Sequence, residues 1–267
     1  MEKEIQYEFT ELVKNNFSKI SENYDQHSQI QKKCASLLVL GLDKDKKYNE
    51  ILEIGCGTGH YTDLLVKKYP RSKITAVDIS CDMLFRARNK ISHKNVSFIP
   101  GNIEEITFTK KFNLITSSAC LQWLEKPINT FRILSEILFQ DGVAHFLIYG
   151  PKTYKELDEV LSNHLGKGGW VTARNFMSKD ILQNIFQKYF ESFTITEHIL
   201  TETFSSLMDF FKQIKLSGTR GYGLDKKTYL GKNMIKQMED EYILRYGGIV
   251  VSHQVYLCRA VKPKTKS

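Results

Sequence analysis

A glycine-rich bend holds the residues best suited to bind a ligand. The stretch ILEIGCGTGHYT occupies residues 51–62, where an apolar run leads into a helical pattern. The acid and the glycines of the bend are Glu53, Gly55, Gly57 and Gly59. Glycine tolerates positive φ and lets a ligand approach the backbone, and the first turn of the following helix has N–H groups without partners. The segment therefore predicts a ligand site where a strand turns into a helix.

The spacing within this bend argues against a phosphate ligand. A dinucleotide site favours G-x-G-x-x-G, and a phosphate-binding P-loop needs Lys and then Ser or Thr after its glycines. This chain has G-x-G-x-G and no such Lys. Glu53 would repel a phosphate, whereas its carboxylate suits a cation such as the amino group of an amino-acid moiety.

Two later turns carry polar groups at corresponding places. Asp78 ends the next apolar run, about 20 residues past the bend, where a carboxylate can accept both hydroxyls of a ribose. Asn102 and Ile103 follow the third run, where an amide can bond the edge of an adenine and an aliphatic side chain can pack on its ring. Amino acid, ribose and adenine without phosphate together describe S-adenosylmethionine (AdoMet).

Short apolar runs alternate with helical patterns between residues 50 and 150. Runs that are apolar on both faces are typical of buried strands in a parallel sheet, and strand–helix alternation over this length predicts a doubly wound α/β sheet. The runs cover residues 51–54, 74–77, 96–99, 114–116 and 143–149, and the helical patterns cover residues 61–69, 83–90 and 130–139.

Helical patterns also flank this core. The first 40 residues predict an N-terminal helical cap, with a second helix at 29–40. After residue 150 the pattern predicts helices at 154–165, 179–189, 203–216 and 226–245, and strands at 192–200 and 249–261. Because ligands bind at the carboxyl edge of open α/β sheets, we expect a lid there. The expected division of the chain is a cap at 1–40, lid segments at 151–191 and 202–247, and closing strands at 192–201 and 249–261.

Composition excludes several classes of protein. Hydrophobic residues make up 42% of the 267 residues, with 16 Phe and 13 Tyr, so the chain is not expected to be disordered. The longest apolar stretch, residues 35–42, is far shorter than the ~20 residues that span a bilayer, and the start of the chain lacks a signal-peptide core. Five irregularly spaced cysteines predict neither a disulfide framework nor a zinc site. We expect a cytoplasmic protein without a metal or a membrane partner.

Positive charge gathers late in the chain. The net charge is +8, and residues 202–267 contain 12 Lys and Arg against 6 Asp and Glu. Such an excess fits a solvated surface, and it also fits a docking face for an acidic partner or a nucleic acid. The excess alone does not distinguish these readings.

Four motifs together resemble the class I AdoMet-dependent methyltransferases. They are LEIGCGTG (52–59), VDIS (77–80), GNIEEI (101–106) and SSACLQWL (117–124). The resemblance implies a single Rossmann-like methyltransferase domain over 1–267, with a mostly parallel seven-stranded sheet and an AdoMet-binding core at 50–150. It implies cofactor contacts from Gln31, Glu53, Gly55, Cys56, Gly57, Thr58, Gly59, Asp78, Ile79, Met83, Asn102, Ile103 and Ser117.

The flanking segments are similar to a narrower family, the malonyl-acyl-carrier-protein O-methyltransferases of biotin synthesis. FSKISENYDQHSQIQ (17–31) resembles the N-terminal pattern F-x-x-x-A-x-x-YD-x-x-A-x-x-Q, and LQW follows the fourth run. IKLSGT (214–219) and VVSHQVYLCRAV (250–261) match more loosely. The chain departs from the family pattern at Ser21, Ser28, Asn102, the order Arg174-Asn175-Phe176, and His253.

This narrower resemblance implies methylation of the free carboxylate of a malonyl thioester. A carboxylate of pKa ~4 is already ionised at neutral pH, so we name no general base, and alignment of the reactants supplies ~7–11 kcal/mol. The implied partner is acyl-carrier protein carrying malonyl, or malonyl-CoA, docked on residues 202–267. The substrate-positioning candidates are Tyr24, Gln122, Trp123, Arg174 and Lys215, of which Arg174 or Lys215 would orient the carboxylate.

Three other functions stay open at this point. One is methylation of another small carboxylic acid or metabolite. A second is RNA methylation, against which stands the lack of an N-P-P-Y-like motif or a basic aromatic module after the fourth run. The third is an AdoMet-binding protein without catalysis, against which stand the intact glycine bend, Glu53 and Asp78.

Overall fold

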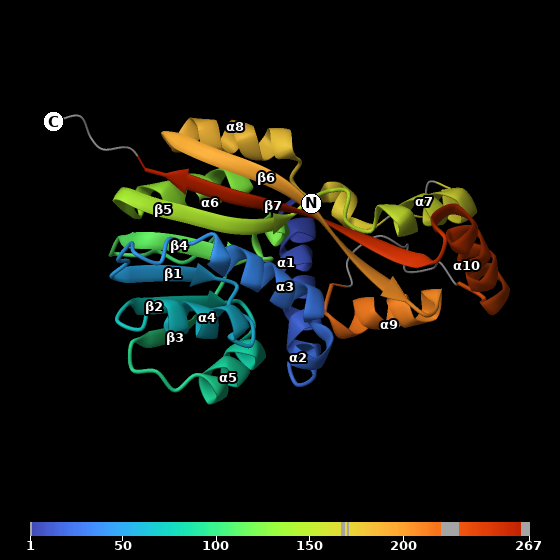
Figure 1. The fold of residues 1–267 in the computed structure, drawn as a ribbon, viewed down its shortest axis with the longest axis horizontal. Coiled ribbons are helices and arrows are strands. Elements are labelled where there is room, and N and C mark those ends of the chain that lie inside the picture. The colour runs from blue at the N-terminus through green and yellow to red at the C-terminus, as the bar shows by residue number, and fades with distance from the viewer. Residues whose placement is uncertain (1, 167–168, 170, 220–229, 263–267) are drawn as a thin grey trace.

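The protein is built around a seven-stranded sheet of order β3-β2-β1-β4-β5-β7-β6 (Figure 1). The structure is a computed structural model that describes residues 2–166, 169, 171–219 and 230–262. The strands are β1 (Glu50–Ile54), β2 (Lys73–Asp78), β3 (Val96–Pro100), β4 (Phe112–Ser118), β5 (Leu138–Tyr149), β6 (Ser192–Phe204) and β7 (Ile249–Val261). β1 to β5 pair in parallel, and β7 runs antiparallel to its neighbours β5 and β6. The predicted mostly parallel, seven-stranded fold is therefore confirmed.

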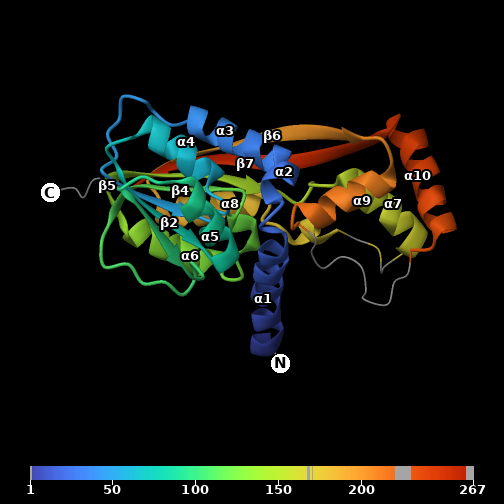
Figure 2. The same ribbon diagram turned by 90° about the horizontal axis from the view of Figure 1, so that it is seen from below.

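Helices cover both faces of this sheet. α3 and α4 lie on one face and α6 and α8 on the other (Figures 1 and 2). The described helices are α1 (Glu2–Ile20), α2 (Tyr24–His27), α3 (Gln29–Leu40), α4 (His60–Lys68), α5 (Cys81–Lys90), α6 (Pro127–Glu136), α7 (Lys155–Leu165), α8 (Lys179–Tyr189), α9 (Leu207–Leu216) and α10 (Lys232–Tyr246), with 3-10 turns at Leu121–Trp123 and Thr172–Asn175. Because both faces are covered, the central strands carry apolar side chains on both faces, as the sequence predicted, with a few buried polar residues such as Glu53 and Thr116 among them.

β6 and β7 continue past the sheet as a two-stranded ribbon. β7 pairs with β6 along its whole length, whereas β5 reaches along β7 only as far as Val255. The first half of β7 therefore has β6 as its one strand partner. α7, α9 and α10 pack around this ribbon and form a core of their own, which includes Leu157, Phe210 and Tyr242. Figure 2 shows the ribbon and its helices projecting from the sheet.

Two predicted helix boundaries were wrong, one because a strand begins there and one because a capping residue starts the helix later. The helix expected at 130–139 ends at Glu136, since Leu138 begins β5. The helix expected at 203–216 begins at Leu207, where the Ser206 hydroxyl accepts a bond from the Asp209 N–H at 3.1 Å. Of the helix expected at 226–245, the structure describes α10 from Lys232 to Tyr246, and residues 226–229 lie outside the described part of the chain.

The expected lid segments also need correction. Residues 202–204 are part of β6, which is longer than the expected strand at 192–201. α8 was expected within a lid segment at 151–191, but it packs on the sheet. Phe186 of α8 lies with its ring centroid 5.4 Å from that of Phe131 and 6.4 Å from that of Phe146. α8 therefore belongs to the main core, and α7, α9 and α10 make up the separate helical part.

Candidate active site

Glycine shapes the bend after β1. Gly55 has φ 71° and Gly57 has φ 54°, both in the left-handed region. A Cβ added at Gly55 would lie 2.4 Å from the Cys120 side chain, so no larger residue fits there. A Cβ at Gly57 would meet nothing within 4 Å. Gly57 therefore borders open space, where a ligand can approach the backbone.

Asp78, the last residue of β2, presents a carboxylate to this space. Its Oδ2 accepts a bond from the Gly57 N–H at 2.8 Å, and its Oδ1 accepts one from the Ser80 N–H at 2.9 Å. Burial raises the pKa of the Asp78 carboxyl, and the two backbone donors offset part of that rise. Because each carboxylate oxygen has further lone pairs, Asp78 can also accept from two hydroxyls of a ligand.

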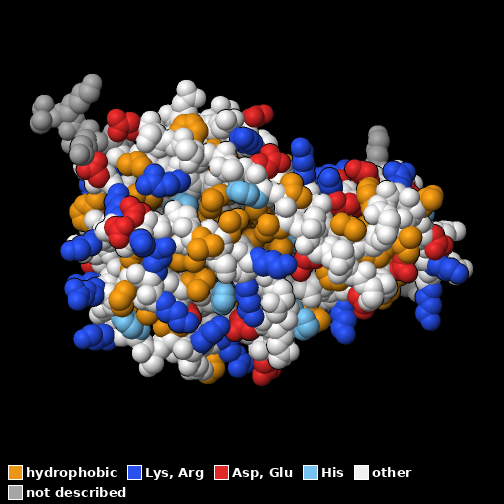
Figure 3. Space-filling view, in the orientation of Figure 1, with side chains coloured by type: hydrophobic (Ala, Val, Ile, Leu, Met, Phe, Trp, Pro, Cys, Tyr) orange, Lys and Arg blue, Asp and Glu red, His pale blue; other side chains and the backbone are white. Residues whose placement is uncertain are grey.

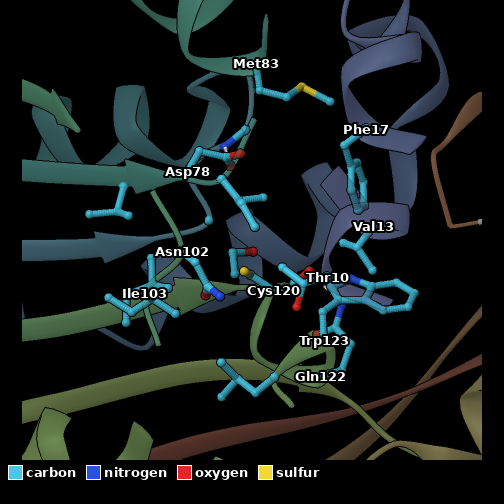
Figure 4. Close-up of a pocket in the computed structure, with 18 of the residues that line it drawn as sticks. Thr10, Val13, Phe17, Asp78, Met83, Asn102, Ile103, Cys120, Gln122 and Trp123 are labelled. Carbon is cyan, nitrogen blue, oxygen red and sulfur yellow. Dashed lines mark hydrogen bonds between the residues drawn. The ribbon is translucent and has the colours of Figure 1, made fainter. Parts of the chain in front are cut away.

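A cavity of about 130 Å³ opens at the carboxyl ends of the parallel strands, and we call it the smaller cavity. Figure 4 shows Asp78 and Asn102 on one side of it, from the strand ends, and Val13 and Phe17 of α1 on the opposite side. The N-terminal helices thus complete a site whose floor is made by the sheet.

Polar contacts hold the N-terminal helices over this cavity. The hydroxyls of Ser18 and Ser80 lie 2.8 Å apart, which ties α1 to the start of α5. Asp25 of α2 accepts a bond from the Thr58 hydroxyl at 2.6 Å and forms an ion pair with Lys90 at 2.8 Å. These contacts fix α2 on the glycine bend and on α5.

A second cavity, of about 400 Å³, adjoins the first, and we call it the larger cavity. The wall shared by both consists of Gln31, Gln122, Trp123, Tyr149 and Thr219. The rest of its lining comes mainly from the helical part around the ribbon and is mostly apolar. It comprises Thr153, Tyr154, Leu157, Leu161, Val171, Thr172, Ala173, Phe176, Phe211, Ile214, Lys215, Leu230 and His253.

Trp123 is held in the shared wall by aromatic neighbours. Its ring centroid lies 5.2 Å from that of Phe176, 6.4 Å from that of Phe17 and 6.2 Å from that of Phe9. Gln122, beside it, donates from Nε2 to the Ala119 carbonyl at 2.8 Å. Two large side chains in fixed orientations therefore separate the cavities.

Most of the residues predicted to bind ligands do line these cavities. Those that line the smaller cavity are Tyr24, Gln31, Gly55, Gly57, Asp78, Ile79, Met83, Asn102, Ile103, Gln122 and Trp123. Lys215 lines the larger cavity and is exposed on α9. Burial, and then the Asp78 charge, raise the pKa of Tyr24, so its hydroxyl keeps its proton and can donate.

Five predicted cofactor residues line neither cavity, and direct contact of these five with the cofactor stays a prediction. They are Glu53, Cys56, Thr58, Gly59 and Ser117. Ser117 donates to the Ile54 carbonyl at 2.8 Å, and Thr58 donates to Asp25. Ser117 and Thr58 therefore hold the backbone around the glycine bend without lining a cavity.

Glu53 is the most unusual of these five residues. Its side chain is 1% exposed, and neither carboxyl oxygen has a hydrogen-bond partner among the described residues. Burial raises the pKa of Glu53 to about 8, the Asp78 charge adds to the rise, and the nearby Thr62 hydroxyl offsets part of it. At neutral pH Glu53 is therefore mostly protonated, in contrast to the charged group expected from the sequence.

Arg174 also lies outside both cavities, against expectation. Its Nε donates to Asp158 Oδ2 at 2.6 Å, and its Nη2 donates to the Ser162 hydroxyl at 2.6 Å. Asp158 in turn accepts a bond from the Val171 N–H at 2.8 Å. Arg174 thus belongs to a partly exposed ion pair that braces the turn after α7, and it does not face an acceptor.

The sequence did not single out several residues of the cavities. Thr10, Val13 and Phe17 of α1 line the smaller cavity, and Tyr149 lies in the shared wall. The apolar spacing of α1 indicated a buried face but gave no sign of what that face would cover. His253 was noted as a departure from a family pattern, and no function was predicted for it.

Two further findings concern the described part of the chain. It contains no group of three or more His, Cys, Asp or Glu side chains arranged to hold a metal ion. None of its helices has both the length and the apolar character needed to cross a membrane.

Comparison with known proteins places this architecture in a family. Residues 51–142 match the model of a methyltransferase domain. Malonyl-acyl-carrier-protein O-methyltransferase 2 of Ilyobacter polytropus is 32% identical over 250 residues, which cover 92% of this chain and 95% of that protein. A protein of the same name, without the numeral, from Halalkalibacterium halodurans is 32% identical over 249 residues, covering 88% and 91%.

The chain belongs to the malonyl-acyl-carrier-protein O-methyltransferase family. As a member of this O-methyltransferase family, it is an AdoMet-dependent enzyme. Solved structures share the fold. The YcgJ protein of Bacillus subtilis has a TM-score of 0.60 at 16% identity, covering 87% of this chain and 99% of that one. The N-methyltransferase NodS of Bradyrhizobium japonicum, in complex with S-adenosyl-L-homocysteine, has a TM-score of 0.53 at 14% identity, covering 94% and 99%.

The residues of the smaller cavity fit the cofactor of this O-methyltransferase family. Asp78 has lone pairs available for ribose hydroxyls, and Asn102 and Ile103 offer an amide and an aliphatic surface to an adenine. Gly57 leaves the backbone open to the amino-acid end of the ligand. AdoMet, when bound there, supplies an electrophilic methyl group on its sulfonium.

Proposed function

We propose that this enzyme methylates the free carboxylate of a malonyl thioester carried by acyl-carrier protein, at the start of biotin synthesis. The observation that carries the proposal is the extent of similarity to relatives of that name. It covers 92% of the chain and so extends far beyond the methyltransferase-domain match at 51–142, into the segments that surround the larger cavity.

Within this proposal the smaller cavity binds the cofactor. Asp78 accepts from the ribose hydroxyls, Asn102 and Ile103 receive the adenine, and Gly55 and Gly57 lie against the amino-acid end. Glu53, Cys56, Thr58, Gly59 and Ser117 act from behind by holding the bend. α1 closes the site over the cofactor and keeps water away from the methyl group.

The larger cavity receives the acceptor. Its apolar lining suits the chain of a thioester arm, and the shared wall brings the end of that arm against the cofactor cavity. Because the acceptor carboxylate is already ionised at neutral pH, the enzyme has no proton to remove. The chain's contribution is alignment, worth ~7–11 kcal/mol for well-oriented reactants. Tyr24, Gln122, Trp123 and Lys215 are the residues placed to contribute to it.

A labelling assay tests this function directly. Purified protein with methyl-labelled AdoMet and malonyl-acyl-carrier protein should give a labelled methyl ester on the carrier. Asp78→Ala should abolish the product, and Asp82→Ala should retain it, since Asp82 is exposed on α5 nearby. Malonyl-CoA as the acceptor determines whether the carrier protein itself is recognised.

Complementation gives an independent test. The gene should restore growth of a biotin auxotroph that lacks this methylation step, and its Asp78→Ala variant should not. Stable, soluble protein that binds AdoMet but neither complements nor labels the carrier would contradict the proposal. It would favour another small carboxylic acid as the acceptor.

A further inference from the structure

A histidine and a glutamate contact each other on the ribbon beside the larger cavity. In the β6–β7 register, Leu200 pairs with His253 and Glu202 pairs with Val251, so His253 and Glu202 are diagonal neighbours on one face. His253 Nε2 lies 2.9 Å from Glu202 Oε2, and the two side chains are 3% and 17% exposed. Glu202 therefore fixes the orientation of the imidazole.

His253 also lines the larger cavity. Its ring centroid lies 5.2 Å from that of Tyr154 and 6.0 Å from that of Tyr149, a residue of the shared wall. Glu202 contacts the Nε2 nitrogen of the imidazole. The second ring nitrogen, Nδ1, has no hydrogen bond to a described residue. A ligand in the cavity is the partner available to it.

The chemistry of the cavity narrows the kind of ligand. Among its described lining residues, only His253 and Lys215 can carry positive charge, and Lys215 is exposed whereas His253 is buried. A carboxylate that enters an apolar cavity loses its water, which is costly unless a charged or donor group replaces it. An imidazolium donates from both ring nitrogens, so such a group can bond Glu202 through Nε2 and a ligand carboxylate through Nδ1.

We infer that His253, oriented by Glu202, receives the acceptor carboxylate in the larger cavity and directs it toward the shared wall. The inference rests on the proposed function, for which it supplies the group that recognises the acid. His253 is then a substrate-binding residue and Glu202 a positioning residue. Since the methyl ester formed is neutral, it loses this contact, and the site favours the free acid over the product.

Kinetics of paired variants test the inference. His253→Phe keeps a ring against Tyr149 and Tyr154 but removes both nitrogens. It should raise the KM for malonyl-acyl-carrier protein roughly ten- to hundredfold, as expected for a hydrogen bond to a charged group. Glu202→Gln should raise KM by a smaller factor. In both variants kcat should change less than KM, and AdoMet affinity by calorimetry should be unchanged.

Glu197→Gln provides the matched control. Glu197 accepts a bond from Gln254 at 2.7 Å across the same two strands, and Gln254 adjoins His253 in sequence, so the pair lies on the opposite face. This variant should keep KM within about twofold. A rise equal to that of Glu202→Gln would assign the effect to the strength of the ribbon and overturn the inference.

Product inhibition gives a readout that depends on charge. The wild-type enzyme should bind the free acid more tightly than its methyl ester, and His253→Phe should lose that preference. If His253→Phe fails to fold, Glu202→Gln carries the same comparison. If the wild type is active and both variants keep its KM and its preference for the free acid, the inference is overturned and the proposed function stands. A wild type inactive on malonyl-acyl-carrier protein overturns the proposed function, and the inference with it.

Discussion

Burial sets the protonation state of Glu53, and this makes the stability of the fold depend on pH. The pKa of Glu53 rises from 4.5 to about 8 in the folded protein, mainly through burial. Below pH 4.5 the group is protonated in both states. Between these values the unfolded chain releases the proton and the folded chain keeps it, so the stability contributed by Glu53 is lost as pH rises. Above about pH 8 the loss is complete.

Glu53→Gln should remove this dependence. The amide is a neutral isostere of the protonated acid, so the variant should gain stability relative to wild type as pH increases. The difference in unfolding free energy should grow by about 3–5 kcal/mol between pH 4.5 and 8. Urea unfolding at several pH values measures it. Glu50→Gln, on the same strand but ion-paired with Lys110 at 2.7 Å, should show no such growth.

Arg174 and Lys215 should respond differently to truncation. Arg174→Ala removes a partly exposed ion pair outside both cavities, so it should leave the KM for the acceptor within about twofold and lower stability by about 1 kcal/mol or less. Lys215→Ala removes a cation from the larger cavity and should raise that KM several-fold. Steady-state kinetics of both variants measure the KM for the acceptor. An equal rise of this KM in both would contradict the placement of Arg174 outside the cavities.

At the scale of elements, the N-terminal helices α1 and α2 form and hold one wall of the proposed cofactor cavity. α1 lines the smaller cavity with Thr10, Val13 and Phe17. The contacts that hold these helices in place include those of Asp25 on α2, which bonds Thr58 and pairs with Lys90 outside the cavity. The affinity for AdoMet should therefore depend on contacts that do not touch the ligand. The ribbon is a second example: Glu202 of β6 does not line the larger cavity, but it orients His253, which does.

Asp25→Ala should weaken AdoMet binding about three- to tenfold, because it releases α2 from Thr58 and Lys90. Calorimetric titration with AdoMet measures the effect. Glu22→Ala is the matched control, since Glu22 makes an exposed ion pair with Arg86 at 3.5 Å beside the same helix. Equal affinities of wild type and Asp25→Ala would mean that α1 holds its place without this contact.

At the scale of the molecule, positive and negative side chains are mixed on the helical part. α9 and α10 carry Lys212, Lys215, Lys232, Lys236 and Arg245 against Asp209, Glu239, Asp240 and Glu241. Figure 3 shows Lys and Arg side chains at the lower edge of the part that holds α9 and α10, with Asp and Glu among them, and further Lys and Arg side chains over the sheet. α9 also borders the larger cavity through Phe211, Ile214 and Lys215. An acidic carrier that docked on this face would lie close to the proposed acceptor cavity. Charge complementarity of this kind chiefly accelerates and orients association.

Charge reversal on α10 tests the docking face. Lys232→Glu with Lys236→Glu should raise the KM for malonyl-acyl-carrier protein about three- to tenfold, more at low salt than at high, and leave AdoMet affinity unchanged. Lys226 and Lys227, which the sequence pattern also indicated, lie outside the described residues. The control is Lys67→Glu with Lys73→Glu, two exposed lysines of the sheet part. An equal KM in both double variants would locate the dock elsewhere.

The sequence by itself determined the sheet, its order of elements and the cofactor side of the site. β1 to β4 and the turns after them are short, consecutive segments, and the glycine bend, Asp78 and Asn102 each lie at the end of a strand or within two residues after it. Parallel strands bring their carboxyl ends to one edge, so local pattern alone places these residues together. The bend at 52–59, Asp78, and Asn102 with Ile103 together predicted the cofactor for the same reason.

The tertiary structure decided which residues surround the proposed acceptor cavity and why burial raises the pKa of Glu53. His253 and Glu202 meet across 51 residues of sequence because β7 pairs with β6 in one particular register. Arg174 had a suitable residue type, but its neighbours Asp158 and Ser162 hold it away from both cavities. The sequence pattern predicts which side chains are buried. Contacts between segments distant in sequence determine which groups surround each buried or charged side chain, and those groups determine what it can bind.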